Sequence, residues 1–245
     1  MALSSVNAEL QNAVRDLVLA NKILYKSGVL DAYGHVSARH PLAPDQFLLS
    51  RNLAPALVTA GDILAFGLDG EPTAPTAEPL YLERYIHSEV YRSRPDVVSV
   101  VHSHSPSVIP FGVTEERLRP VFHMSAFLGQ GAPVFEIRDK FGDETNLLIT
   151  NSNMGAALAD ALGESAVLLL RGHGNVVVAP TLRLAVFRAI YTETNAQLQI
   201  DALRMGRRKI NYLSRGEAKA VTAVAGKLVD RTWDLWVAES GDDSV

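Results

Sequence analysis

Two histidines follow a run of small β-branched residues in the stretch VVSVVHSHSP, which covers residues 97–106. Because side chains alternate between the two faces of a strand, His102 and His104 would lie on one face, about 7 Å apart. A third, His173, follows another apolar run in AVLLLRGHGN. Each alone is explained by hydrogen bonding at a strand end, but polar residues at the ends of buried strands also build the sites of α/β proteins. The three together favour a metal site.

The ligand chemistry available to such a site is restricted, because the chain contains no cysteine. Disulfides and thiolate ligands are therefore excluded, and any ion must be held by imidazole and oxygen. Three imidazoles leave a coordination position open for substrate or water, as in catalytic zinc sites. We expect one divalent ion per subunit, and this ligand set does not distinguish Zn, Mn, Fe, Co and Mg.

A carboxylate precedes these histidines in the segment LERYIH, where Glu83 and His87 stand four residues apart. This spacing would place both side chains on the same side of a helix. Taken alone, the segment favours an ordinary solvated helix face. The alternative makes Glu83 an acid/base or a fourth ligand, because its helix runs directly into the strand that carries His102.

Further polar residues are candidates for substrate binding. His35 lies in the glycine-containing segment YGHVSARHP, which we expect to be a loop, either a cradle for an anion or a polar surface turn. Ser50 and Arg51 end the predicted strand QFLLS, where the guanidinium is suited to pair with a carboxylate, although a single exposed arginine is more often solvated. His123 is flanked by apolar residues, which favours a core histidine.

Composition restricts the protein class. The chain of 245 residues is 47% hydrophobic, enough for a sizeable core, and we expect a single domain over residues 1–245. Lys and Arg total 23 against 27 Asp and Glu, a net charge of −4, and no basic stripe suggests nucleic acid as a partner. There is no signal-peptide pattern and no apolar stretch near the ~20 residues of a membrane span, so we expect a cytoplasmic protein.

Strands and helices that alternate along the chain would have to position these residues, which predicts an α/β fold. Helices are predicted over 7–26, 80–94, 152–163, 181 to about 205, and 218–238, with a short one within 106–130. Strands are predicted over 46–50, from 61 into a turn at 68–70, and over 96–101, 133–138, 146–150, 165–171 and 175–179.

Four short motifs occur in a fixed order: Gly34-His35-Val36-Ser37, Glu83 with His87, His102-Ser103-His104 and Gly172-His173-Gly174. In this order and at these separations, they resemble the class II aldolase/adducin family over most of the chain. The resemblance implies a three-layer α/β/α fold around a largely antiparallel sheet, a homotetramer and a divalent metal. Position by position, it places the metal ligands at His102, His104 and His173 and the acid/base at Glu83.

The departures from the sugar-phosphate aldolases of that family narrow the expected activity. Those enzymes carry Gly-Asn-Val-Ser and a serine pair before the glutamate to bind phosphate, whereas here His35 replaces the asparagine and PLYL precedes Glu83. Between residues 106 and 133 there is no tyrosine to match their catalytic one, and His123 is the nearest candidate for that proton transfer.

The segments GHVSARHP, PLYLERYIH and HSHSP look instead like the decarboxylase branch, which acts on hydroxylated aromatic or heteroaromatic carboxylates and on ring-cleavage products. We therefore expect a metal-dependent, non-oxidative decarboxylase of a small carboxylate, acting through a metal-stabilised enolate. Its substrate would contact His35, Ser50 and Arg51. The alternatives are an aldolase, epimerase or dehydratase acting on a small sugar or sugar phosphate, and a non-catalytic adducin-like module.

Overall fold

One mixed sheet organises the chain in the computed structural model, which describes residues 2–206 and 209–240. Seven strands from these residues lie in the order β3-β2-β1-β4-β7-β6-β5. All neighbouring pairs are antiparallel except β5 and β6, which are parallel. The strands are β1 (His35–Arg39), β2 (Gln46–Ser50), β3 (Ile63–Gly67), β4 (Ser99–Ser103), β5 (Val134–Phe135), β6 (Val167–Leu170) and β7 (Gly174–Ala179).

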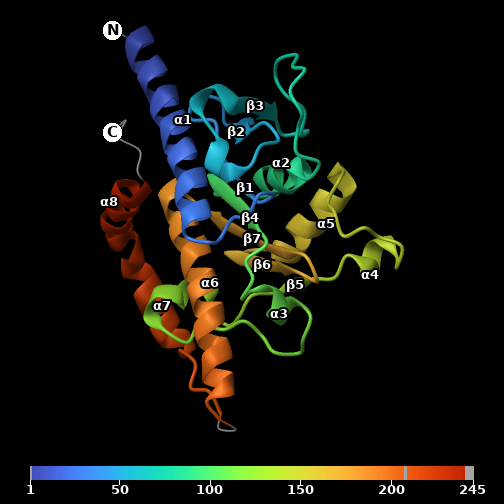
Figure 1. Cartoon of the computed structure of the whole chain (residues 1–245), viewed down its shortest axis with the longest axis vertical. Coiled ribbons are helices and arrows are strands. Elements are labelled where there is room, and N and C mark those ends of the chain that lie inside the picture. Colours follow the sequence, from blue (N-terminus) through green and yellow to red (C-terminus); the bar gives the residue numbers. More distant parts are fainter. Residues whose placement is uncertain (1, 207–208, 241–245) are drawn as a thin grey trace.

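Helices cover both faces of this sheet and make the three layers that the resemblance implied (Figure 1). One face carries α1 (Ala2–Lys26), α6 (Leu182–Arg204) and α8 (Val229–Ser240), which contact one another. The other carries α2 (Arg84–Ser93) and α5 (Ser152–Leu162). The shorter helices are α3 (Ile109–Gly112), α4 (Arg138–Phe141), α7 (Arg215–Ala225) and the 3-10 turns η1 (Pro55–Leu57), η2 (Ala60–Asp62), η3 (His123–Leu128) and η4 (Gly226–Leu228).

Two apolar clusters, one on each face, hold the layers together. Successive strand residues alternate between them: Val101 packs with α1 and α6, whereas its neighbour Val100 packs with α2 and α5. The central strands are therefore apolar throughout, as expected for a sheet covered on both sides. Burial of each Val or Leu side chain stabilises the fold by ~1.5–3 kcal/mol. The packed sheet therefore holds the side chains at the ends of its strands in fixed positions.

Three segments differ from the sequence predictions. Residues 35–39, predicted as a loop, form β1 between β2 and β4, because pairing on both sides outweighs their polar character. Residues 146–150, predicted as a strand, are irregular: the side chains of Thr145 and Asn146 accept from the backbone N–H groups of Leu147 and Leu148 and replace ladder hydrogen bonds. The predicted helix over 218–238 is divided by η4.

No helix in the described ranges combines the length and the apolar character needed to cross a lipid bilayer.

Candidate metal centre

Four predicted residues meet where the central strands β4 and β7 end and begin. One potential ligand atom from each of Glu83, His102, His104 and His173 lies within 4.8 Å of the others. His102 is in β4, His104 follows its end, and His173 lies in the turn between β6 and β7. Because β4 and β7 are antiparallel neighbours, the end of one meets the start of the other and their histidines converge. The structure thus brings together the four residues that the motifs singled out.

Glycines on both sides of His173 make this convergence sterically feasible. Gly172 has a φ of +67°, a backbone conformation that glycine adopts without strain. A Cβ atom on Gly174 would lie 2.1 Å from the backbone oxygen of Ser103, so only glycine lets β7 approach β4 this closely.

Each of the three histidines has an oxygen atom beside its Nδ1. His102 Nδ1 lies 3.2 Å from the backbone oxygen of Asn175, His104 Nδ1 lies 3.0 Å from Asp31 Oδ2, and His173 Nδ1 lies 3.1 Å from the backbone oxygen of Leu147. A carbonyl or carboxylate oxygen only accepts, so each Nδ1 carries the proton and donates it. Each Nε2 is then left with a free lone pair, the arrangement that metal-binding histidines adopt.

The free Nε2 atoms fit a divalent cation. Those of His102 and His104 are buried without a hydrogen-bond partner in the described part of the chain, which is costly for polar atoms unless something binds them. Glu83 Oε2 lies 3.6 Å from His102 Nε2 and 3.5 Å from His173 Nε2, beyond good hydrogen-bond distance. Lone pairs that face one another at this spacing repel unless a cation lies among them.

Glu83 is held in its ionised form at this point. Burial by itself would raise the pKa of its carboxyl group, but positive charge on the side of His102 and His173 outweighs that effect and lowers the pKa well below its usual range. Its Oε1 accepts a 2.9 Å hydrogen bond from the backbone N–H of Ile149, in the irregular segment after α4. The carboxylate is thus anchored through one oxygen, and the other faces the histidines.

The solvated helix face that the segment LERYIH favoured by itself is wrong. The helix α2 begins at Arg84, so Glu83 is its N-cap and not a residue on its face. Glu83 is 8% exposed and His87 is fully buried, because α2 packs against both the sheet and α5. The role of Glu83 as an acid/base or a fourth ligand stays a prediction.

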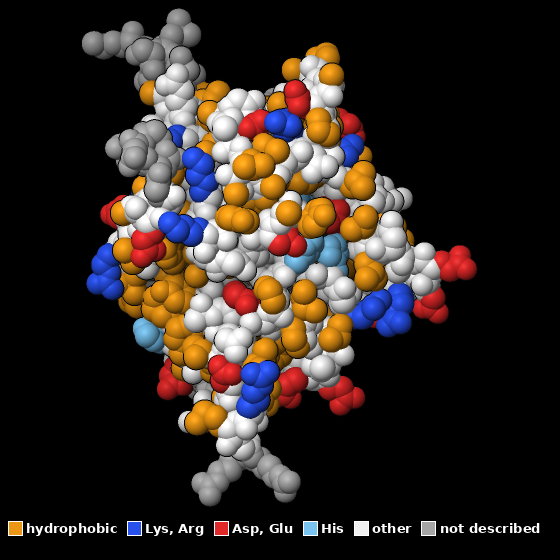
Figure 2. Space-filling model, viewed as in Figure 1, with side chains coloured by type: hydrophobic (Ala, Val, Ile, Leu, Met, Phe, Trp, Pro, Cys, Tyr) orange, Lys and Arg blue, Asp and Glu red, His pale blue; other side chains and the backbone are white. Residues whose placement is uncertain are grey.

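A pocket of about 410 Å³ opens beside the four residues. Its walls are mainly aromatic and apolar, and none of the described residues that line it is Lys or Arg. Figure 2 shows histidine atoms at a depression on this face, next to acidic atoms. The lining residues are Tyr33, His35, Asn52, Tyr81, Leu82, Glu83, His104, Asn146, Leu147, Leu148, Gly172 and His173. This volume is at the lower end of the range for small-molecule sites and suits a single-ring compound.

The three residues predicted to bind substrate have different surroundings. His35 lines the pocket, with its ring 4.5 Å from that of Tyr81 and 5.0 Å from that of His102. Ser50 is buried behind Tyr81, with 3.4 Å between their hydroxyl oxygens, and does not line the pocket. Arg51 donates from Nε to Asp62 Oδ1 at 2.6 Å, so the structure pairs it with an internal carboxylate. Substrate contact by Ser50 and Arg51 stays a prediction.

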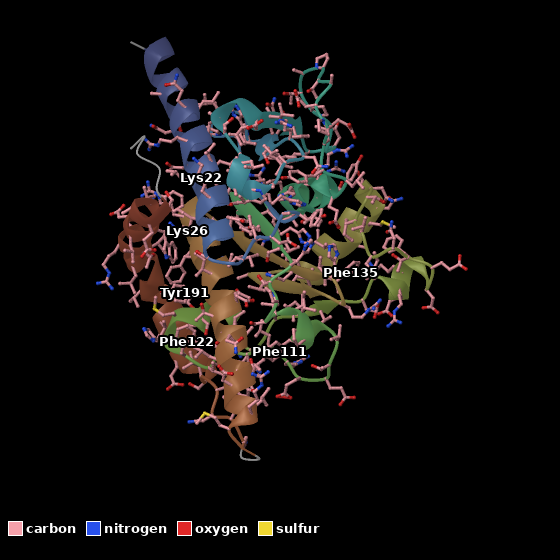
Figure 3. All side chains as sticks on the ribbon, viewed as in Figure 1. Lys22, Lys26, Phe111, Phe122, Phe135 and Tyr191 are labelled. Atoms are coloured by element: carbon pink, nitrogen blue, oxygen red, sulfur yellow. The ribbon has the colours of Figure 1, made fainter. Side chains whose placement is uncertain are left out.

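His123 is exposed on η3, and the expectation of a core histidine is wrong. Its neighbour Phe122 packs instead, with its ring 6.0 Å from that of Tyr191 on α6 (Figure 3). His123 lines a separate, smaller cavity with residues of α6 and does not line the pocket beside the metal centre. Its proposed part in proton transfer therefore stays a prediction.

Several residues of the site had not been singled out from the sequence. Asp31 and Asn175 orient metal-site histidines, and no local pattern marked them. Tyr81 stands two residues before Glu83 and forms a wall of the pocket. His87 was singled out only for its spacing from Glu83; its contact with His35, at 2.6 Å between ring nitrogens, was not expected. The spacing of His87 and Tyr91 on one side of α2 was the available signal for this contact.

Comparisons with known proteins agree with this geometry. The model of the class II aldolase and adducin N-terminal domain matches residues 15–200. A decarboxylase, tropJ, from Talaromyces stipitatus is 38% identical over 92% of this chain and 93% of its own length. A 3,4-dihydroxyphthalate decarboxylase from Arthrobacter keyseri is 30% identical over 78% of each chain.

A solved L-fuculose 1-phosphate aldolase from Glaciozyma antarctica superposes with a TM-score of 0.79 over 97% of this chain and 93% of its own, at 21% identity. That identity supports a shared fold alone. With the family model covering most of the sequence and the four motifs converging on one site, the chain belongs to the class II aldolase and adducin family.

Proposed function

We propose that this protein is a metal-dependent, non-oxidative decarboxylase of a hydroxylated aromatic or heteroaromatic carboxylate or dicarboxylate, or of a related ring-cleavage keto acid. The observation that carries the proposal is a cluster of three histidines and a glutamate beside a ring-sized pocket with mainly aromatic and apolar walls. The two similar decarboxylases support the reaction type.

A divalent ion in this centre would be held by His102, His104 and His173 through Nε2. In decarboxylation, the bond between carbon and the carboxylate breaks, CO2 leaves, and an electron pair stays on carbon. When bound, the ion would supply a Lewis acid for the oxygen next to that carbon and stabilise the developing charge by several kcal/mol, each ~1.4 kcal/mol being worth a factor of ten in rate.

The chain's own side chains would orient the substrate and move the proton. Tyr81, Leu147 and Leu148 form walls that exclude water from a bound ring. Glu83, whose Oε2 faces the histidines, would take a proton from the substrate's hydroxyl group and return it to the carbon after CO2 has left. His35 is placed to contact an oxygen of the substrate. For the final proton, His123 is kept as the alternative donor.

The pocket disfavours a sugar phosphate. Phosphate sites are usually rich in Arg, Lys or free backbone N–H groups, and the described residues around this pocket include neither Arg nor Lys. The adducin-like alternative is disfavoured because buried, unpartnered Nε2 atoms have a cost that a purely structural module has no reason to retain.

The test is a substrate panel with the metal-loaded protein. We expect CO2 release from hydroxy-aromatic mono- or dicarboxylates and no cleavage of sugar phosphates, measured in parallel with zinc, manganese or cobalt added. Retro-aldol products from sugar phosphates without CO2 release would overturn the proposal in favour of an aldolase. Metal binding with no turnover of either class would favour the non-catalytic alternative.

A further inference from the structure

A row of four buried polar side chains leads from the pocket into the protein. His35 Nδ1 lies 2.6 Å from His87 Nε2, His87 Nδ1 lies 2.6 Å from Ser37 Oγ, and Ser37 Oγ lies 2.7 Å from the hydroxyl oxygen of Tyr91. All four residues are at most 2% exposed. Two of them come from β1 and two from α2, so the row spans the interface between sheet and helix.

The distances decide which way the protons point. The Tyr91 hydroxyl has two acceptors, Ser37 Oγ at 2.7 Å and the backbone oxygen of Val98 at 3.4 Å. Only the first distance is normal for a hydroxyl donor, which favours donation from Tyr91 to Ser37 over donation to Val98. Ser37 then donates its own proton to His87 Nδ1, His87 donates from Nε2 to His35 Nδ1, and the remaining proton of His35 is on Nε2.

His87 keeps this polarity because it stays neutral. Burial, assisted by the nearby His102, lowers the pKa of His87 to about 3, so at neutral pH its ring has one proton and must donate from one nitrogen while accepting at the other. The hydrogen bonds along such a buried row all run in one direction, because reversing a single bond would leave two donors facing each other.

We propose that Tyr91, Ser37 and His87 are positioning residues that keep Nδ1 of His35 an acceptor and its proton on Nε2, so that His35 donates a hydrogen bond to an anionic oxygen of the substrate. His35 lines the pocket, and Nε2 is the ring nitrogen that the row leaves free for a ligand. The choice of substrate rests on the proposed decarboxylase function. The row would thereby select a carboxylate or enolate oxygen at this position over an uncharged hydroxyl donor.

The tautomer is tested first without any turnover. The zinc-loaded protein is labelled with 15N-histidine, and long-range 1H–15N correlations are recorded, with the His35 signals assigned from their loss in His35→Gln. We expect Nε2 of His35 to be protonated and Nδ1 to be an acceptor. A proton on Nδ1 would overturn the proposal, whatever reaction the protein catalyses.

The second test removes the row while sparing the pocket. In His87→Leu, His35 loses its partner, and we expect KM for a hydroxy-aromatic carboxylate to rise about tenfold with a smaller change in kcat, because a hydrogen bond to a charged group is weakened. His87→Gln should restore KM to within about threefold of the wild type, because the amide can accept from Ser37 and donate to His35. Tyr91→Phe, an almost isosteric change, repeats the test if His87→Leu does not fold.

Tyr85→Phe is the matched control. It deletes a hydroxyl group from the same helix, but that hydroxyl donates to Glu71 at the surface and does not belong to the row. It should leave KM unchanged. If no substrate is turned over, the dissociation constant of benzoate for the zinc-loaded variants is measured by calorimetry, and the same tenfold difference is expected. Equal affinity of wild type, His87→Leu and Tyr91→Phe would contradict the proposal, whereas failure of the substrate panel alone would contradict only the decarboxylase function.

Discussion

At the residue scale, the candidate metal centre depends on three histidines whose Nδ1 atoms each donate a hydrogen bond to an oxygen atom. We predict that His102→Ala abolishes both bound metal and turnover, because it removes a buried ligand whose Nε2 has no other partner in the described structure. Zinc content, measured by elemental analysis, should fall from about one ion per chain to near zero.

His40→Ala is the control for that substitution, because His40 lies beyond β1 and does not line the pocket. It should keep wild-type metal content and activity. Full activity of metal-free His102→Ala would show that the centre does not need an ion and would remove the basis of the proposed reaction.

At the element scale, the contact of α5 with α2 fixes the helix that begins immediately after Glu83. Gly155 of α5 makes this contact, and a Cβ there would lie 2.4 Å from the backbone oxygen of Tyr85. We predict that Gly155→Ala lowers the free energy of unfolding by about 2 kcal/mol, since overpacking of up to ~3 kcal/mol exceeds the ~1 kcal/mol gained in helix propensity. Urea denaturation measures this difference.

Gly216→Ala, in α7, is the matched control. The nearest atom to a Cβ there is Ser214 Oγ at 3.9 Å, so the substitution has room and should be neutral or slightly stabilising. If both variants unfold at the same urea concentration as the wild type, the close packing of α5 on α2 does not limit stability.

At the scale of the whole molecule, we predict a homotetramer, as the family resemblance implies. Large apolar side chains remain exposed on the helical layer that contains α6 and α8, among them Leu198 at 41% and Leu235 at 55%. Burying such side chains between copies of the chain would be favourable. Light scattering after size-exclusion chromatography should give about four times the chain mass of 26.6 kDa, and a monomer mass at micromolar concentration would contradict the prediction.

The sequence by itself determined the metal-centre candidates, the family and the order of most elements. The continuous apolar runs around Val100 and Leu168 and the long helix after Thr181 are local patterns, and the structure contains them. That a single domain spans the whole chain stays a prediction. His102, His104 and His173 were found because each lies at or just beyond the end of an apolar run, which is also a local signal.

Only the tertiary structure decided which partner each polar group has. In the structure, Glu83 is a buried N-cap and not a residue on a helix face, and Arg51 pairs with Asp62. His123 is exposed, and His87 lies behind His35. These outcomes depend on contacts between residues far apart in the chain, such as His35 and His87. Periodicity reports which face of an element is apolar, whereas the hydrogen-bond partners across a sheet depend on strand order and register.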